Sequence, residues 1–173
     1  MRIKMKKLFL LISLALIMCS KPKMETVKID KLIWQKCSLG LSGADCSQGT
    51  AIELPWEDAV KACENLTEDG KKWRLPTLEE LSSLITCKDG KKITKDISCN
   101  WDEKEMAPDV QRSVFDSNIF PGTKKDFYWT SFTDEYESLD GTKKILAYNI
   151  DFDFGMVLRV EKKKKKFIRC VTE

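Results

Sequence analysis

The chain has 173 residues and no histidine. It therefore has no Ser-His-Asp or Cys-His catalytic machinery, no histidine-ligated zinc and no imidazole general base. Hydrophobic residues make up 42% of the sequence and charged residues 33%. A chain of this length and composition supports one domain with its own core, and nothing in it indicates a disordered or fibrous protein.

The sequence also lacks an apolar run long enough to span a bilayer as a helix, which takes about 20 residues. The apolar run Leu8–Met18, interrupted only by Ser13, is too short, and it follows a basic start with Arg2, Lys4, Lys6 and Lys7. A charged start before a short apolar stretch is typical of a secretory signal. The alternative, a buried first helix, fits poorly because the run has no polar face.

The apolar run ends in Leu16-Ile17-Met18-Cys19-Ser20, which resembles the lipobox of a bacterial lipoprotein. The resemblance implies a signal peptide over 1–18, a lipid on Cys19, and a linker over 19–28 that leads into a domain over 29–173. Met18 departs from the small residue usual before the cysteine, so ordinary signal cleavage nearby is the alternative. A lipid anchor would hold the protein on a membrane of the bacterial envelope, at the outer membrane or cell surface.

Cleavage before Cys19 also changes the charge balance of the protein. The signal carries four of the 30 basic residues and none of the 27 acidic ones, so 26 basic residues remain. The apparent net charge of +3 then disappears, and the mature chain becomes slightly acidic with one concentrated run of lysines.

Six further cysteines follow Cys19, and an even number behind an export signal indicates a disulfide framework. Zinc is the rival explanation, but the chain has no Cys-x-x-Cys pair and no histidine, so we expect no metal. Local geometry favours Cys37–Cys46 and Cys87–Cys99, because each pair closes a Gly- or Lys-rich loop. This choice leaves Cys63 with Cys170, a pair that would tie the first helix to the last strand.

The periodicity of the sequence predicts two helices and several strands. We expect a strand over 27–35, a first helix over 55–66 and a second helix from 78 to near 87. Thr77 and Glu80 form a T-x-x-E capping box before the second helix. Further strands are expected over 127–132, 146–152, 156–160 and 167–171, and the lysines at 162–166 fall in the turn between the last two.

Several motifs in this order resemble the Lcl C-terminal domain family, named for a collagen-like adhesin of Legionella, within the C-type-lectin-like clan. The most specific is the run Trp73-Arg74-Leu75-Pro76-Thr77 with Glu80, and Phe127–Ser131 around Trp129, Asp151-Phe152 with Gly155, and Arg169-Cys170-Val171 follow it. The resemblance implies an α+β, C-type-lectin-like fold, with two helices on a small, twisted, mostly antiparallel sheet stapled by disulfides. It also matches a Cys63–Cys170 bridge from helix to last strand.

These motif residues also have a purely structural explanation. Trp73 and Leu75 are expected in the core, and the Arg74 guanidinium would satisfy buried carbonyls or a carboxylate. Trp129 is either a core residue or a platform for a sugar, and the core is favoured because large aromatic side chains dominate core burial.

Two segments are candidates for ligand binding. The acidic run Thr133–Glu137, with Asp140, offers oxygen ligands of the kind that Ca²⁺ takes, although solvated loop charge is the favoured explanation. The cationic cluster is the better candidate, since adjacent cations attract sulfated glycans, anionic lipid or another acidic polymer. It comprises Arg159, Lys162, Lys163, Lys164, Lys165 and Lys166, with Arg169 on its other flank.

The sequence therefore predicts a non-catalytic envelope lipoprotein, without a cofactor, that serves as a binding or adhesion module for glycans or host matrix. One alternative is a structural envelope lipoprotein without a soluble ligand. Another is a divergent oxidase of the formylglycine-generating type, which needs a reactive cysteine pair near the carboxy terminus, where this chain has only Cys170. Nucleic acid is not an expected partner of an exported, disulfide-bonded domain.

Overall fold

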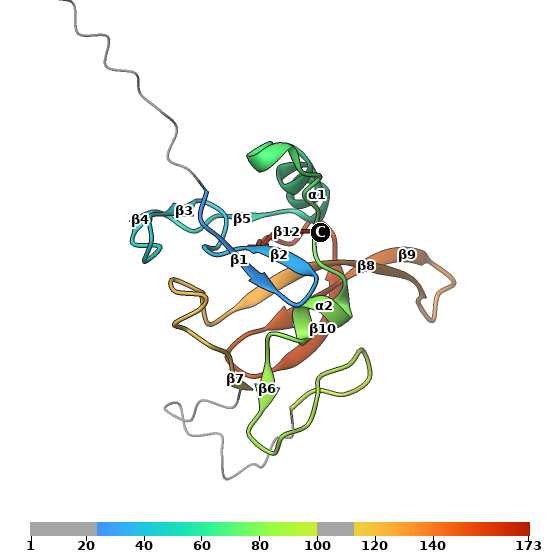
Figure 1. The fold of residues 1–173 in the computed structure, drawn as a ribbon. Helices are drawn as coiled ribbons and strands as arrows, with labels where there is room; N and C mark the ends of the chain where they lie inside the picture. Colours follow the sequence, from blue (N-terminus) through green and yellow to red (C-terminus); the bar gives the residue numbers. More distant parts are fainter. Residues whose placement is uncertain (1–23, 100–112) are drawn as a thin grey trace, which may run out of the picture.

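A computed structural model describes residues 24–99 and 113–173 (Figure 1). The expected signal peptide over 1–18 and the lipidation site Cys19 lie outside these residues. In the described part the fold is α+β, with few helices and mostly antiparallel sheets, as predicted for the fold class. No helix in the described part is both long and apolar enough to cross a membrane.

The elements of the described chain are short except for one long hairpin formed by β8 and β9. In chain order they are β1 (Thr26–Ile29), β2 (Leu32–Gln35), β3 (Leu41–Ser42), β4 (Gln48–Gly49), β5 (Glu53–Leu54), α1 (Trp56–Glu64), the 3-10 turn η1 (Glu68–Gly70), α2 (Leu78–Ser82), β6 (Thr86–Cys87), β7 (Ser113–Val114), β8 (Phe127–Glu137), β9 (Lys143–Asp151), β10 (Met156–Glu161), β11 (Lys166–Phe167) and β12 (Val171–Thr172).

The central sheet has five strands in the order β10-β9-β8-β11-β5. Its pairs are antiparallel except β8 with β11, which run parallel at Phe167 and Tyr128. A second sheet of order β1-β2-β12 brings the start and the end of the domain together, through the pairing of Trp34 with Val171. The β8–β9 hairpin extends beyond the body of the molecule (Figure 1).

The two faces of the central sheet pack against different helices. Successive side chains of a strand point to opposite faces, so neighbours on β8 and β9 enter different cores. Tyr128 and Ile150 join Leu78 and Leu81 of α2 in one hydrophobic cluster. Trp129 and Ala147 join Ala59 and Cys63 of α1 in the other. The base of the hairpin is therefore covered on both sides.

The structure contains three disulfides: Cys37–Cys46, Cys63–Cys170 and Cys87–Cys99. They are the pairs expected from the sequence. Cys63–Cys170 links α1 to the residue before β12 across a sequence separation of 107. Closing a loop of this length restricts the unfolded chain and stabilises the fold by about 4–5 kcal/mol in the chain-entropy model.

The predicted strand over 27–35 is wrong in one respect, because the structure forms a hairpin there. Chain reversal occurs between β1 and β2 at Asp30, whose φ of 52° is in the left-handed region. Aspartate tolerates this conformation better than most residues, so the turn needs no glycine. Strand β1 begins at Thr26, one residue before the start of the predicted strand.

Three other predicted elements also differ. Helix α2 ends at Ser82 rather than near Cys87, since the Ser82 and Ser83 hydroxyls donate to the carbonyls of Glu79 and Glu80 and compete with helix continuation. The acidic run Thr133–Glu137 belongs to strand β8 and is not a loop. The last predicted strand is split into β11 and β12.

Candidate functional site

The motif around Trp73 and Arg74 forms a tightly connected corner of the fold. Arg74 donates from Nη1 and Nη2 to the two carboxylate oxygens of Glu80, at 2.7 and 2.8 Å. The capping box is complete, because Glu80 accepts from the Thr77 backbone N–H at 2.7 Å and donates its own N–H to Thr77 Oγ1 at 3.1 Å. Trp73 and Leu75 are buried. These contacts give the motif a structural role.

The electrostatics of this corner follow from its geometry. Partial burial opposes ionisation of Glu80, but hydrogen bonds from Arg74 and from the Thr77 backbone outweigh it, and the net pKa of Glu80 is lowered. The hydrogen bond to Glu80 raises the pKa of Arg74 in turn. The pair is thus ionised and mutually satisfied, which leaves little of Arg74 for a ligand.

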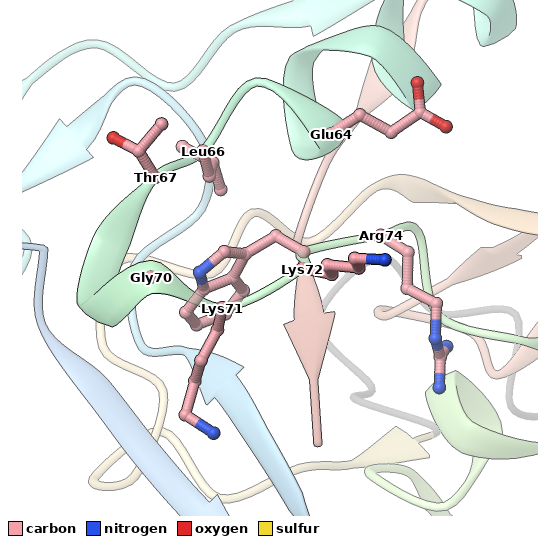
Figure 2. Close-up of a pocket in the computed structure, with 8 residues that line it drawn as sticks. Glu64, Leu66, Thr67, Gly70, Lys71, Lys72 and Arg74 are labelled. Carbon is pink, nitrogen blue, oxygen red and sulfur yellow. The ribbon is translucent and has the colours of Figure 1, made fainter.

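A groove of about 520 Å³ lies beside this motif and is lined by residues 64, 66, 67 and 70–74 (Figure 2). Lys71 donates to the backbone oxygen of Glu173 at 2.6 Å, and Arg74 is held by Glu80. In the described part of the chain, Lys72 is the one lysine or arginine of this groove whose side chain has no ion-pair or hydrogen-bond partner. With this single available cation, the groove is a poor candidate for an anion-binding site.

Several side chains of the cationic cluster predicted at 159–166 are engaged by different neighbours. Lys162 lies over the ring of Trp56 at 4.0 Å and pairs with Glu57, while Lys166 lies over the ring of Phe127 at 4.2 Å. Lys163 pairs with Glu161 at 2.8 Å. Among the described residues, the exposed Lys164 and Lys165 are the members of the turn whose side chains have no such partner. The lysines of this run therefore contact several different side chains.

Arg169, the expected flank of that cluster, lies in the core instead. Its guanidinium is fully buried, donates to the backbone carbonyls of Gln35 and Lys36 and to Thr123 Oγ1, and faces the ring of Phe120 at 4.6 Å. Burial lowers its pKa to about 10. Arg169, two residues before β12, therefore links the end of β2 to Thr123 inside the core and contributes nothing to a surface patch.

A different concavity, which we call the sheet pocket, lies on the central sheet and measures about 440 Å³. This volume falls in the range of small-molecule sites. The β8, β9 and β10 strands supply most of its lining, and the loop closed by Cys87–Cys99 supplies the rest. Its residues are Lys95, Asp96, Asp134, Tyr148, Val157, Leu158 and Arg159.

The polar centre of the sheet pocket is built around one carboxylate. Oδ2 of Asp134 accepts from the Tyr148 hydroxyl at 2.9 Å and from Arg159 Nη1 at 3.1 Å. Its other oxygen, Oδ1, is buried and accepts no hydrogen bond from the described residues. Burial and the bond to Asp134 raise the pKa of Tyr148, and the same carboxylate raises the pKa of Arg159. A raised pKa keeps the Tyr148 hydroxyl protonated and Arg159 charged at neutral pH.

Two exposed aromatic rings flank this centre. Phe132, 41% exposed, packs on Tyr148 with ring centroids 4.9 Å apart, and Tyr136, 39% exposed, lies under Arg159 at 5.3 Å. Exposed aromatic faces next to convergent polar groups are typical of ligand sites. The described rings and polar groups together form the most developed candidate site on this sheet.

An irregularity in the sheet positions these groups. Trp129 pairs with Asn149 and Thr133 with Ala147, so three residues of β8 lie opposite Tyr148 alone. Thr130 Oγ1 donates to the Tyr148 carbonyl, and the Ser131 N–H donates to the carbonyl of Pro76, two residues before α2. Bulges of this kind redirect side chains next to functional sites. Here the bulge connects the corner around Trp73 and Arg74, which we call the motif corner, to the sheet pocket.

Of the residues singled out in the sequence as ligand-binding candidates, the sheet pocket contains Arg159 from the cationic cluster and Asp134 from the acidic run. Sequence reasoning missed Phe132, Tyr148 and Lys95 as site residues. The alternation of Asp134 with Tyr136 on one strand face was an available signal. Within the described residues, no three or more Asp, Glu or Cys side chains gather as they would around a metal ion.

Comparison with known families gives one match. The sequence model of a family described as the Lcl C-terminal domain matches residues 26–172. A search of curated proteins and a search of solved structures each return no match. The matched range includes the motif corner, all three disulfides and the sheet pocket.

Proposed function

Since this chain belongs to the Lcl C-terminal domain family, which suggests a surface-associated module of the adhesion type, we propose that it binds glycans without catalysis through the sheet pocket. The observation that carries the proposal is the grouping of Asp134, Tyr148 and Arg159 between the exposed rings of Phe132 and Tyr136. Hydroxyl-rich ligands need polar partners at their edges and apolar contact at their faces, and this pocket supplies both.

The proposal extends to the setting of the domain. A C-type-lectin-like fold agrees with the two helices, the mostly antiparallel sheets and the Cys63–Cys170 bridge. A lipid on Cys19 would place the domain on the bacterial envelope, at the outer membrane or cell surface, within reach of glycans or host matrix proteins. The mass of the mature amino terminus tests the anchor, and an unmodified Cys19 would contradict it.

Binding without catalysis is favoured by the state of the cysteines. Cys63 and Cys170 are joined with an S–S distance of 2.06 Å, and both residues are buried. An oxidase of the formylglycine-generating type would need a free thiolate. Thiol counting by mass spectrometry should find none of the six cysteines free, and a free Cys63 or Cys170 would revive the enzyme hypothesis.

The binding proposal is tested with immobilised glycans and matrix proteins, presented to the purified protein with and without calcium. We expect Phe132→Ala/Tyr136→Ala to weaken the strongest interaction at least about tenfold. The matched control, Lys164→Ala/Lys165→Ala, changes two exposed side chains of the lysine turn and should bind as the wild type does. Absence of binding above background, or equal binding by the pocket variant, would contradict the proposal.

A further inference from the structure

The charges of the sheet pocket compensate one another. Asp134 pairs with Arg159 at 3.1 Å, and Lys95 pairs with Asp96 at 3.4 Å. The pocket lining therefore holds two cations and two anions. A polyanion gains affinity from uncompensated positive charge, and the described lining of this pocket offers none. The electrostatics favour a ligand without net charge.

Hydrogen-bonding capacity points the same way. The Asp134 side chain is 31% exposed, and its carboxylate only accepts hydrogen bonds, so a ligand group beside it must donate. Arg159 uses Nη1 on Asp134 and has further N–H groups, so a ligand group beside it must accept. Neighbouring hydroxyls of a sugar ring can do both, whereas a sulfate group only accepts hydrogen bonds and would be repelled by the carboxylate.

The aromatic rings fit the rest of such a ligand. Phe132 and Tyr136 lie on the same strand, four residues apart, and each leaves about two fifths of its surface exposed, at 41% and 39%. The faces of pyranose rings carry C–H groups that pack on aromatic faces, and a chain of sugars presents such faces repeatedly. Two rings along one strand suit an oligosaccharide better than a single sugar.

We propose that the ligand of the sheet pocket is an uncharged oligosaccharide of hexoses with neighbouring free hydroxyls, bound between Asp134 and Arg159 and packed on Phe132 and Tyr136. This inference rests on the proposed glycan-binding function and narrows it to one class of glycan. The inference predicts that binding does not depend on the lysine turn at 162–166. It also predicts only a weak dependence on salt, because no net charge is neutralised on binding.

The test is a calorimetric titration of the purified protein with gluco-, galacto- and manno-configured neutral trisaccharides and, separately, with a heparin-derived hexasaccharide. We expect at least one neutral trisaccharide to bind, with an affinity that changes less than about twofold between low and high salt. Phe132→Ala and Arg159→Gln should each reduce that affinity about tenfold, and Lys164→Ala/Lys165→Ala should leave it unchanged.

The outcomes separate the inference from the function on which it rests. Binding of the heparin fragment alone, weakened steeply by salt and by Arg159→Gln, would overturn the neutral-ligand inference and leave the pocket as a glycan site. A third outcome is that Lys164→Ala/Lys165→Ala abolishes binding while the pocket variants still bind. This result would overturn both the inference and the proposed site. Proton shifts of the Phe132 and Tyr136 rings on addition of the trisaccharide provide a second readout for variants that fold poorly.

Discussion

The two halves of the β8–β9 hairpin share strands but differ in what covers them. At the base, 127–130 and 147–151, both faces are closed: α2 packs with Tyr128 on one side, and α1 packs with Trp129 on the other. In the outer half, 131–146, Phe132 and Tyr136 remain two fifths exposed. The base therefore specifies the fold, and the outer half is free to present side chains to a ligand.

Aromatic residues of the same hairpin therefore have different roles. Trp129 and Tyr128 are strongly recognisable in the sequence, yet both are fully buried and serve the core. Phe132 and Tyr136 are less noticeable, yet they are the rings that a ligand can reach. An aromatic residue becomes a binding residue only where no second layer packs against its face of the sheet.

The largest expected effect is at the base. Trp129→Ala should lower the free energy of unfolding by about 3–5 kcal/mol, because it opens a cavity and removes the hydrogen bond from Nε1 to the Leu54 carbonyl. Denaturant unfolding followed by far-UV circular dichroism measures the change. A loss under about 1 kcal/mol would show that the base does not carry the core.

The Cys87–Cys99 disulfide closes the loop that delivers Lys95 and Asp96 to the sheet pocket. Cys87→Ala/Cys99→Ala should cost about 3 kcal/mol in the chain-entropy model, given the sequence separation of 12. It should also weaken binding of the neutral trisaccharide. Unchanged affinity in this variant would mean that the loop is not part of the site.

Glu80→Gln tests the motif corner, which connects to the bulge through Pro76 and Ser131. We expect a loss of about 1–2 kcal/mol at pH 7 from the ion pair and the capping box. The folded-state pKa of Glu80 lies below its ordinary value of 4.5. The stabilisation is therefore complete above that value and is lost as pH falls through the folded-state pKa.

Unfolding curves between pH 7 and pH 3 check this dependence. The difference between wild type and Glu80→Gln should shrink as the pH drops, with little change in affinity for the sugar at pH 7. A difference that stays constant with pH would show that the ion pair is not the source of the stabilisation.

Tyr148 lies at the boundary between the two halves, and its hydroxyl orients Asp134. Tyr148→Phe keeps the ring that packs on Phe132 but removes this hydrogen bond, so we expect a loss of about 1 kcal/mol in stability. Affinity for the trisaccharide should fall about tenfold, because Asp134 is then held by Arg159 alone. Calorimetry on the two proteins measures it, and equal affinities would remove Asp134 from the site.

Much of the fold was predictable because its signals are local. The T-x-x-E spacing at Thr77 and Glu80 identified the start of α2, and alternating residues identified β9. The end of α2 was not predictable from periodicity, since it depends on serine hydroxyls returning to helix carbonyls. The hairpin at Asp30 was not predicted because aspartate forms the turn, and the glycine that usually marks such a turn in a sequence is missing there.

The site was far less predictable than the fold. Its polar residues meet only through strand register, a bulge and a disulfide-closed loop; they are Lys95, Asp96, Asp134, Tyr148 and Arg159. The lysine run was conspicuous in the sequence, but its cations lie on different neighbours in space. Adjacency in sequence therefore did not indicate which partner each side chain contacts.

The central claim is that the outer half of the β8–β9 hairpin binds the ligand, whereas its base stabilises the fold. Phe132→Ala tests this claim most directly. The measurement is a trisaccharide titration of wild type and Phe132→Ala, with the unfolding free energy of each determined in the same buffer. The account predicts a loss of at most about 1 kcal/mol in stability and a drop of about tenfold in affinity. Unchanged affinity, with or without a loss of stability, would contradict it.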